Sequence, residues 1–183
     1  MKLALVGHGS IGSRYKDEIS KNTYNIDQFY IVDPKESVLE ELKRNKYKCF
    51  KSVDELKENN IEITHGIVAN WGPDHIHTAN QLIDLGCKRL IVEKPLTNRK
   101  DELQIFKQRC LEENIFVTIH HHWAYTDILK KIKDAEVKFD LGNSQGIRIL
   151  GGSVCLSTNG THYLDLCCDV LGSIPNIIIA ELE

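Results

Sequence analysis

Apolar runs alternate with amphipathic stretches along the first 120 residues. Five runs are bounded by turn residues, as buried parallel strands are, and they occupy residues 3–6, 29–32, 63–69, 90–92 and 115–119. Helical periodicity fills the intervals at about residues 10–20, 36–46, 73–86 and 98–112, and a capping box of Ser52 and Glu55 begins a further helix. Gly86 suits the end of one helix, and Asn98 suits the cap of the next. The alternation predicts an α/β fold, a doubly wound parallel sheet with helices on both faces.

The pattern becomes less regular from residue 121 onward. It predicts a helix, a strand, a glycine-rich turn, a strand, a helix and a last apolar strand, at about residues 123–133, 136–139, 142–146, 147–150, 162–171 and 177–183. We therefore expect two domains. The first is a Rossmann domain at residues 1–120, and the second is a small, incomplete α+β substrate and oligomerisation domain at residues 121–183.

Composition excludes several classes of protein. The chain has 23 Lys and Arg against 26 Asp and Glu, a net charge of −3, and its basic residues are scattered, which argues against nucleic-acid binding. No stretch approaches the roughly 20 apolar residues of a membrane helix, and no signal-peptide pattern is present. We expect a cytoplasmic protein whose six cysteines, none of them in a Cys-x-x-Cys pair, stay reduced.

A glycine loop follows the first predicted strand. Gly7, Gly9 and Gly12 have the spacing that permits a tight turn, a close approach to a pyrophosphate and close packing of a helix on a strand. The start of that helix offers N–H groups to phosphates, so its neighbours His8, Ser10 and Ile11 are expected beside the cofactor. The alternative is a similar turn that binds another ligand, such as S-adenosylmethionine, or none.

Asp33 ends the second predicted strand, 21 positions after Gly12. An acidic side chain there can accept both ribose hydroxyls of an adenosine, whereas it would repel a 2′-phosphate. The sequence therefore favours NAD over NADP. Arg14 and Lys35 lie close enough in sequence to soften that preference.

Glu93, Lys94 and Pro95 follow a buried strand, at the edge where open α/β sheets bind their ligands. A lysine in a partly desolvated cleft can hold a hydroxyl or carbonyl oxygen and favour negative charge there. The alternative is a salt-bridged surface pair before a loop proline.

Taken with the loop of Asn70, Trp71, Pro73 and His75, these residues make the chain resemble the Gfo/Idh/MocA family of oxidoreductases. The resemblance implies that Glu93 lies near the nicotinamide ribose and that Lys94 touches the nicotinamide end and the substrate hydroxyl. It also implies a cis Lys94–Pro95 peptide and places the loop from Asn70 to His75 beside the cofactor.

The resemblance resumes at the sequence from Gly160 to Asp165, which looks like the family's Gly-x-His-x-x-Asp helix. His162 would then be the general acid/base, a role that suits an imidazole near neutral pH. Many relatives have an aspartate four residues earlier, where this chain has Thr158. The chain also ends where relatives carry a large antiparallel sheet, so we expect the strand at 177–183 to pair with another copy in a homo-oligomer.

Three consecutive histidines follow the strand at 115–119. Alternation would send His120 and His122 to one face, and we expect a substrate pocket there rather than a metal site, because no carboxylate or thiolate lies at helpful spacing. The alternative is that these side chains form an ordinary polar lining. The residues expected at the substrate are His120, His122, Trp123, Thr158, Asn159 and Tyr163.

The sequence predicts an NAD-dependent dehydrogenase that oxidises a secondary alcohol of a sugar, nucleotide sugar or cyclitol. Lys94 and His162 are the expected catalytic residues. The alternative is an NAD-binding protein of the same family with weak or no activity, such as a sensor, an assembly subunit or a fragment. A third possibility, a methyltransferase, is disfavoured by the sequence Glu93-Lys94-Pro95.

Overall fold

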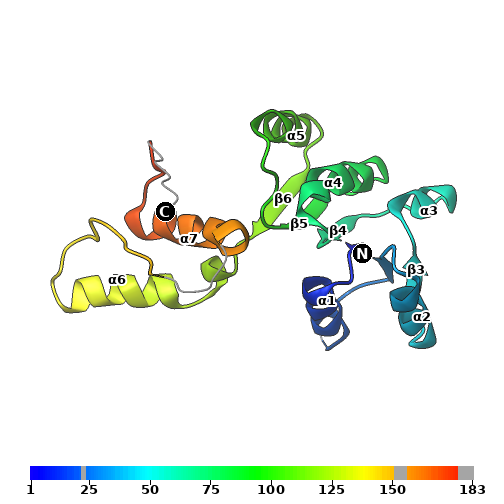
Figure 1. Ribbon diagram of the computed structural model, residues 1–183, viewed down its shortest axis with the longest axis horizontal. Helices are drawn as coiled ribbons and strands as arrows, with labels where there is room; N and C mark the ends of the chain where they lie inside the picture. The colour runs from blue at the N-terminus through cyan, green and yellow to red at the C-terminus, as the bar shows by residue number, and fades with distance from the viewer. Residues whose placement is uncertain (22–23, 151–155, 177–183) are drawn as a thin grey trace. The chain divides into compact units, whose positions relative to one another are not determined.

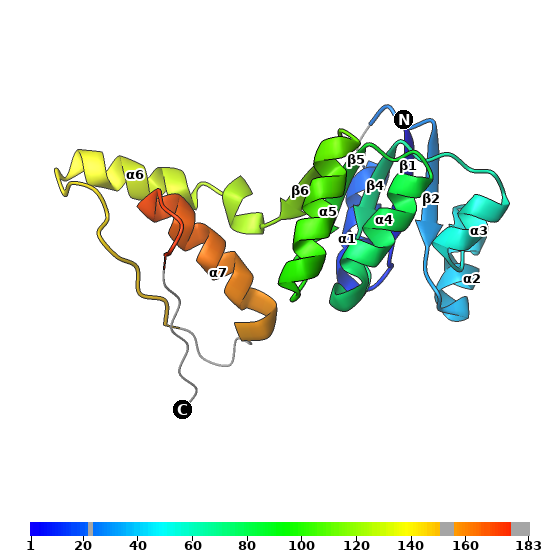
Figure 2. The ribbon, with the colours of Figure 1, turned by 90° about the horizontal axis from the view of Figure 1, so that it is seen from above.

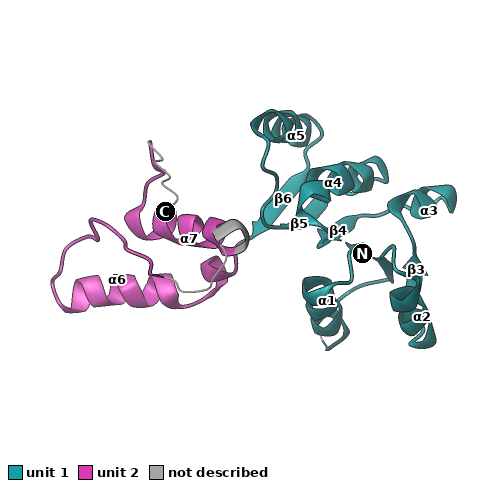
Figure 3. Ribbon diagram, in the orientation of Figure 1, with its two compact units in different colours: residues 1–120 teal, residues 121–183 magenta. Residues whose placement is uncertain are grey.

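The computed structural model describes residues 1–21, 24–150 and 156–176. Two compact units make up the chain, Met1–His120 and His121–Glu183 (Figure 3). None of the described helices is long and apolar enough to cross a membrane.

Unit 1 is built on a parallel sheet, as the sequence predicts, and the sheet has six strands where five were expected. The strand order is β3-β2-β1-β4-β5-β6. The strands after β1 are added on one side of it as far as β3, and β4 then begins the other side, so the order reverses between β1 and β4. Such a reversal opens a crevice at the carboxyl ends of the strands, where ligands bind. The strands are β1 Lys2–Val6, β2 Gln28–Val32, β3 Lys48–Phe50, β4 His65–Val68, β5 Arg89–Glu93 and β6 Phe116–His120.

Helices cover both faces of this sheet. Two of them, α1 and α2, lie on one side, and α3, α4 and α5 lie on the other (Figures 1 and 2). Their bounds are α1 Ser10–Lys21, α2 Glu36–Arg44, α3 Val53–Glu58, α4 His75–Asp84 and α5 Lys100–Glu112. The predicted doubly wound architecture is therefore confirmed.

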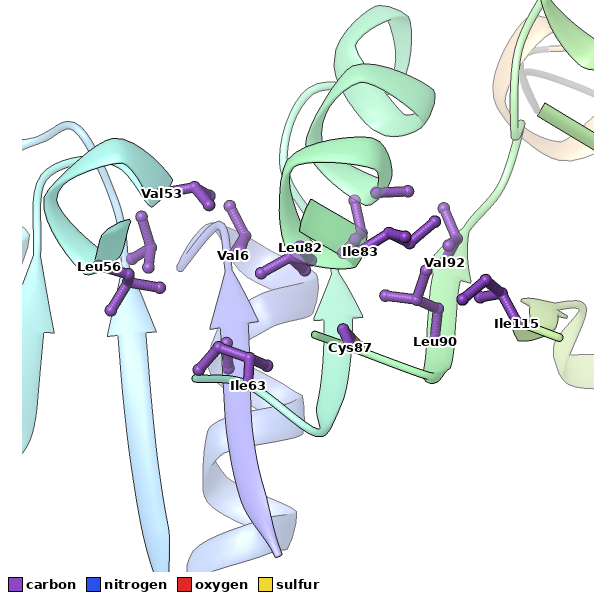
Figure 4. Packing of buried hydrophobic residues seen from close by; sticks show 14 of the residues in the cluster. Val6, Val53, Leu56, Ile63, Leu82, Ile83, Cys87, Leu90, Val92 and Ile115 are labelled. Atoms are coloured by element: carbon purple, nitrogen blue, oxygen red, sulfur yellow. The ribbon is translucent and has the colours of Figure 1, made fainter. Parts of the chain in front are cut away.

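The larger part of the core lies between the sheet and the second set of helices. Leu82 of α4 packs there with Leu90 and Val92 of β5 (Figure 4). Phe106 of α5 belongs to the same cluster. On the opposite face, a smaller apolar cluster contains Leu3, Leu5 and Ile67, with Tyr15 and Ile19 of α1 packed against it. Apolar burial thus fixes the strands whose carboxyl ends form the crevice.

Replacing Leu82 with alanine should lower the free energy of unfolding by about 2–5 kcal/mol, because the fully buried side chain would leave a cavity. Leu111 on α5 is mostly exposed and gives a matched control, for which the expected change is within about 0.5 kcal/mol. Urea unfolding followed by circular dichroism measures both. Equal losses in the two variants would contradict the assignment of Leu82 to the core.

Three details of unit 1 differ from the sequence prediction. The strand β3 was not predicted, because its three residues form too short an apolar run. Before α4, a 3-10 turn, η1 Gly72–Asp74, contains Pro73. The expected Asn98 cap is wrong by one residue: Arg99 occupies the N-cap position of α5, where its side chain makes no capping hydrogen bond and its backbone N–H donates to Thr97 Oγ1. Ser52 does cap α3 by accepting from Glu55 N, as predicted.

The regular secondary structure in the described part of unit 2 is helical. It contains η2 His122–Tyr125, α6 Ile128–Lys138 and α7 Leu156–Leu171. The predicted strand at 136–139 is wrong, because α6 continues to Lys138 and Glu136 pairs with Lys133 at helical spacing. Residues 147–150 form no strand either, since no described neighbour pairs with them. The predicted strand at 177–183, and with it the expected pairing of copies, lies outside the described residues.

Candidate cofactor and active site

The glycine loop joins β1 to α1 in a conformation that requires glycine. Gly7 has φ +93°, and a Cβ there would lie 2.5 Å from the backbone nitrogen of Asn70. A Cβ on Gly12 would lie 1.8 Å from the carbonyl oxygen of Gly7, so α1 packs directly on the loop. Gly9, in contrast, has no atom within 4 Å of its Cβ position. The loop is therefore tight on its inner side and open at Gly9.

Asp33 stands at the carboxyl end of β2 and is only 7% exposed. Its Oδ2 accepts a 2.7 Å hydrogen bond from the backbone of His8, and its Oδ1 accepts a 2.9 Å bond from the backbone of Lys35. Each carboxylate oxygen keeps a second acceptor site. Asp33 can therefore fix the glycine loop and still accept from two ribose hydroxyls.

A groove of about 510 Å³ runs along this edge of the sheet. Its lining includes residues of the glycine loop, the end of β2, the loop after β4 and α4, namely Gly7, Gly9, Asp33, Asn70, Trp71 and Thr78. Two buried polar atoms beside it, His8 Nε2 and Asn70 Oδ1, have no hydrogen-bond partner among the described residues. Because an unsatisfied buried polar atom is costly, a bound polar group is expected there. The open side at Gly9, the acceptor pair of Asp33 and these two atoms fit a dinucleotide.

The loop after β4 is tied to the motif after β5 by His75. This side chain is 2% exposed, and its Nδ1 lies 2.8 Å from the carbonyl oxygen of Pro95 and its Nε2 3.1 Å from that of Asn70. Asn70 also donates to Thr78 Oγ1 at 2.8 Å. His75 does not line the groove, whereas Trp71 does and is 72% exposed. The Lys94–Pro95 peptide bond is cis, which confirms what the resemblance implied.

Glu93 ends β5 and is the centre of a polar cluster. Tyr15 Oη donates to Glu93 Oε1 at 2.9 Å, and His120 Nδ1 lies 2.8 Å from the same oxygen. The Tyr15 hydroxyl also lies 2.8 Å from His120 Nδ1. Burial acts to raise the pKa of Glu93, but the hydrogen bonds with His120 and Tyr15 outweigh it and the pKa is lowered. Glu93 is therefore held as a carboxylate.

Sequence reasoning missed Tyr15. It lies three residues after Gly12, on the side of α1 that packs against the sheet. Its place on the inward face of the helix that follows the glycine loop was the signal that could have identified it. Its partners come from 78 and 105 residues further along the chain, so no local pattern names them.

Unit 2 contains the second group of histidines. His162 lies on α7 and is buried, and its Nε2 is 3.2 Å from Nδ1 of His122. The His122 ring lies against Trp123, with 4.5 Å between the ring centroids. Asn159 and Tyr163 are also on α7, which contains Thr158 one turn before His162. Lys94 belongs to unit 1 and His162 to unit 2.

The expected shared face of His120 and His122 is not found. The strand β6 ends at His120, so alternation does not continue to His122, which begins the turn η2. His120 instead joins the cluster of unit 1, and His122 contacts His162. Within the described ranges, no three His, Cys, Asp or Glu side chains lie together in a way that could hold a metal ion.

Solved structures share the fold at low sequence identity. GenD2 from gentamicin A biosynthesis, solved in complex with NAD, has 20% identity and a TM-score of 0.76, covering 94% of this chain and 54% of that one. Scyllo-inositol dehydrogenase from Lactobacillus casei, solved with NAD(H) and scyllo-inositol, has 14% identity and a TM-score of 0.67, covering 78% and 42%. The chain thus spans about half the length of these proteins. No curated protein sequence matches it.

Residues 1–121 match a family described as an oxidoreductase family with an NAD-binding Rossmann fold. The match covers the glycine loop, Asp33, the sequence from Glu93 to Pro95 and all six strands. It includes about two thirds of the chain. The protein belongs to the Gfo/Idh/MocA family of oxidoreductases and carries its NAD-binding Rossmann fold.

Proposed function

We propose that the chain is an NAD-dependent dehydrogenase that oxidises a secondary alcohol of a sugar, nucleotide sugar or cyclitol. The observation that carries the proposal is the shared edge of the sheet. The glycine loop and Asp33 lie at the carboxyl ends of β1 and β2, in one half of the sheet. Glu93, Lys94 and the cis Pro95 lie at the carboxyl end of β5, in the other half. The scyllo-inositol dehydrogenase that shares the fold supports a cyclitol or sugar substrate.

Each residue then has a separate task. The N–H groups of the first turn of α1, at Ser10 and Ile11, hold the pyrophosphate, and Asp33 accepts from the ribose hydroxyls. Bound NAD⁺ supplies the hydride acceptor. Lys94 holds the substrate hydroxyl oxygen and stabilises the charge that develops on it. The family resemblance gives His162 the role of accepting the hydroxyl proton.

Formation of NADH tests the proposal. The full chain is mixed with NAD⁺ and with a panel of inositols, aldoses and nucleotide sugars, and absorbance of the reduced nicotinamide is followed. NADH production with at least one polyol is expected. Binding of NAD⁺ without any production would contradict the proposal and would favour the second candidate.

That second candidate is an NAD-binding protein of the family without dehydrogenase activity. The observation in its favour is Thr158, which stands where many relatives have an aspartate. A threonine can form a hydrogen bond but does not carry the proton at neutral pH. NADH formation with any substrate in the panel would exclude this candidate.

Replacing Asp33 with asparagine should weaken NAD binding about tenfold, because a charge-assisted acceptor for the ribose is lost. The preference for NAD over NADP should fall by at least about tenfold, since the charge that repels a 2′-phosphate is removed. Titration calorimetry with each dinucleotide measures both changes. An unchanged ratio of the two affinities would show that Asp33 does not contact the ribose.

A further inference from the structure

Tyr15, Glu93 and His120 form a polar cluster in which each side chain contacts the other two. Holding Glu93 in place would not require the contact between Tyr15 and His120. The three polar atoms of the cluster are mutually 2.8–2.9 Å apart, and they come from α1, β5 and β6. Glu93 and His120 are register partners on adjacent strands. The contact between carboxylate and imidazole is therefore built into the sheet.

The chemistry of the contact fixes which ring nitrogen carries a proton. The carboxylate of Glu93 is 8% exposed and ionised, so it accepts from Nδ1 of His120. An imidazole that donates through Nδ1 uses Nε2 as its proton acceptor. Two titratable groups of unit 1, Tyr15 and Glu93, contact Nδ1 of that ring.

His120 also stands where a substrate proton could reach it. It ends β6 at the same edge of the sheet as Glu93 and Lys94, and its side chain is 35% exposed. A buried carboxylate that orients a partly exposed imidazole is the arrangement by which catalytic histidines are held in the productive tautomer. His162 contacts the imidazole of His122 in unit 2. The residue four positions before His162 is Thr158, which is not a carboxylate.

We propose that His120 is a further catalytic residue of this site, a general base held by Glu93 and Tyr15. The inference rests on the proposed dehydrogenase function. As the substrate is oxidised, its O–H and C–H bonds break and a C=O bond forms. The proton passes to Nε2 of His120 rather than to His162, and bound NAD⁺ would take up the hydride. Glu93 and Tyr15 are positioning residues in this step.

Activity measurements test the use of His120. The H120Q variant of the full chain should lose at least about 100-fold in kcat/KM, the range expected for a general base, with NAD⁺ affinity changed less than about threefold. The H120A variant should regain part of its rate when imidazole is added, which a structural role would not produce. His65 provides the control. It begins β4, at the end of the strand away from the site, on the face of the sheet that Tyr15 covers. The H65Q variant should keep wild-type activity.

Ring nitrogen NMR tests the contact with Glu93 independently of turnover. The His120 signals, assigned by their loss in H120Q, should show a proton on Nδ1. The E93Q variant should lose this preference, whereas Y15F should keep it because the carboxylate remains. A proton on Nε2 in the wild-type chain would overturn the dyad.

The outcomes separate the inference from the function on which it rests. An active chain whose H120Q variant keeps its rate contradicts the role of His120 and leaves the dehydrogenase function intact. A chain that binds NAD⁺ but oxidises nothing contradicts the dehydrogenase function and the catalytic use of His120 with it.

Discussion

Replacement of Lys94 with alanine is expected to lower kcat by about 10²–10³-fold, the cost of removing one preorganised group that stabilises a developing oxyanion. The affinity for NAD⁺ should change less than about threefold, because in the proposed binding mode Asp33 and the glycine loop hold the other end of the cofactor. Lys94 directly follows β5 and precedes the cis peptide to Pro95. Steady-state kinetics with the best substrate of the panel and calorimetry with NAD⁺ measure the two quantities.

Lys88 provides the matched control for this variant. It precedes β5 at the opposite edge of the sheet, where its Nζ donates to the carbonyl oxygen of Glu113. Its replacement with alanine should leave kcat unchanged. Full turnover by the Lys94 variant would remove the lysine from the mechanism, and an equal loss in both variants would point to a general effect on the fold.

The sequence predicted those parts of unit 1 that depend on local patterns. Apolar runs identify the buried strands, and the spacing of Gly7, Gly9 and Gly12 identifies the loop, in which Gly7 and Gly12 leave no room for a Cβ. The short strand β3 was missed because it gains its pairing from β2 rather than from its own composition. Local propensity is a weak guide where tertiary pairing decides the structure.

The polar cluster at Glu93 was beyond sequence reasoning for a different reason. Glu93 and His120 were each expected at the site, but their contact depends on the register of β5 against β6, and Tyr15 reaches them from α1. The spacing of these residues along the sequence does not predict contacts between different strands and helices. His75 shows the same limit: it was expected beside the cofactor, and its position in the sequence did not indicate that it joins two loops through their carbonyl groups.

Unit 2 was predicted least well. Its apolar stretches at 136–139 and 147–150 alternate weakly, and short runs of this kind do not distinguish a strand from a helix. In the structure Ser144 donates to Glu136, which closes the chain back on α6. The first run therefore ends a helix, and the second has no partner strand in the described part of the chain.

Alanine substitutions at Gly12 and Gly9 should separate the fold of the loop from its binding function. At Gly12 the new Cβ would overlap the carbonyl oxygen of Gly7, a backbone atom that α1 and β1 hold in place. Overpacking at a rigid site costs about 1–3 kcal/mol or more. The G12A variant should therefore lose about 3 kcal/mol of unfolding free energy in urea and bind no NAD⁺ in calorimetry.

The G9A variant is expected to behave in the opposite way. Its methyl group meets no atom of the protein within 4 Å, so the unfolding free energy should stay within about 1 kcal/mol of wild type. The methyl would occupy the open side of the loop, where the pyrophosphate must approach the backbone. Affinity for NAD⁺ should fall at least about tenfold, or about 1.4 kcal/mol. Wild-type affinity in G9A would mean that the pyrophosphate does not cross the loop at Gly9, and the proposed path of the cofactor along the groove would have to be abandoned.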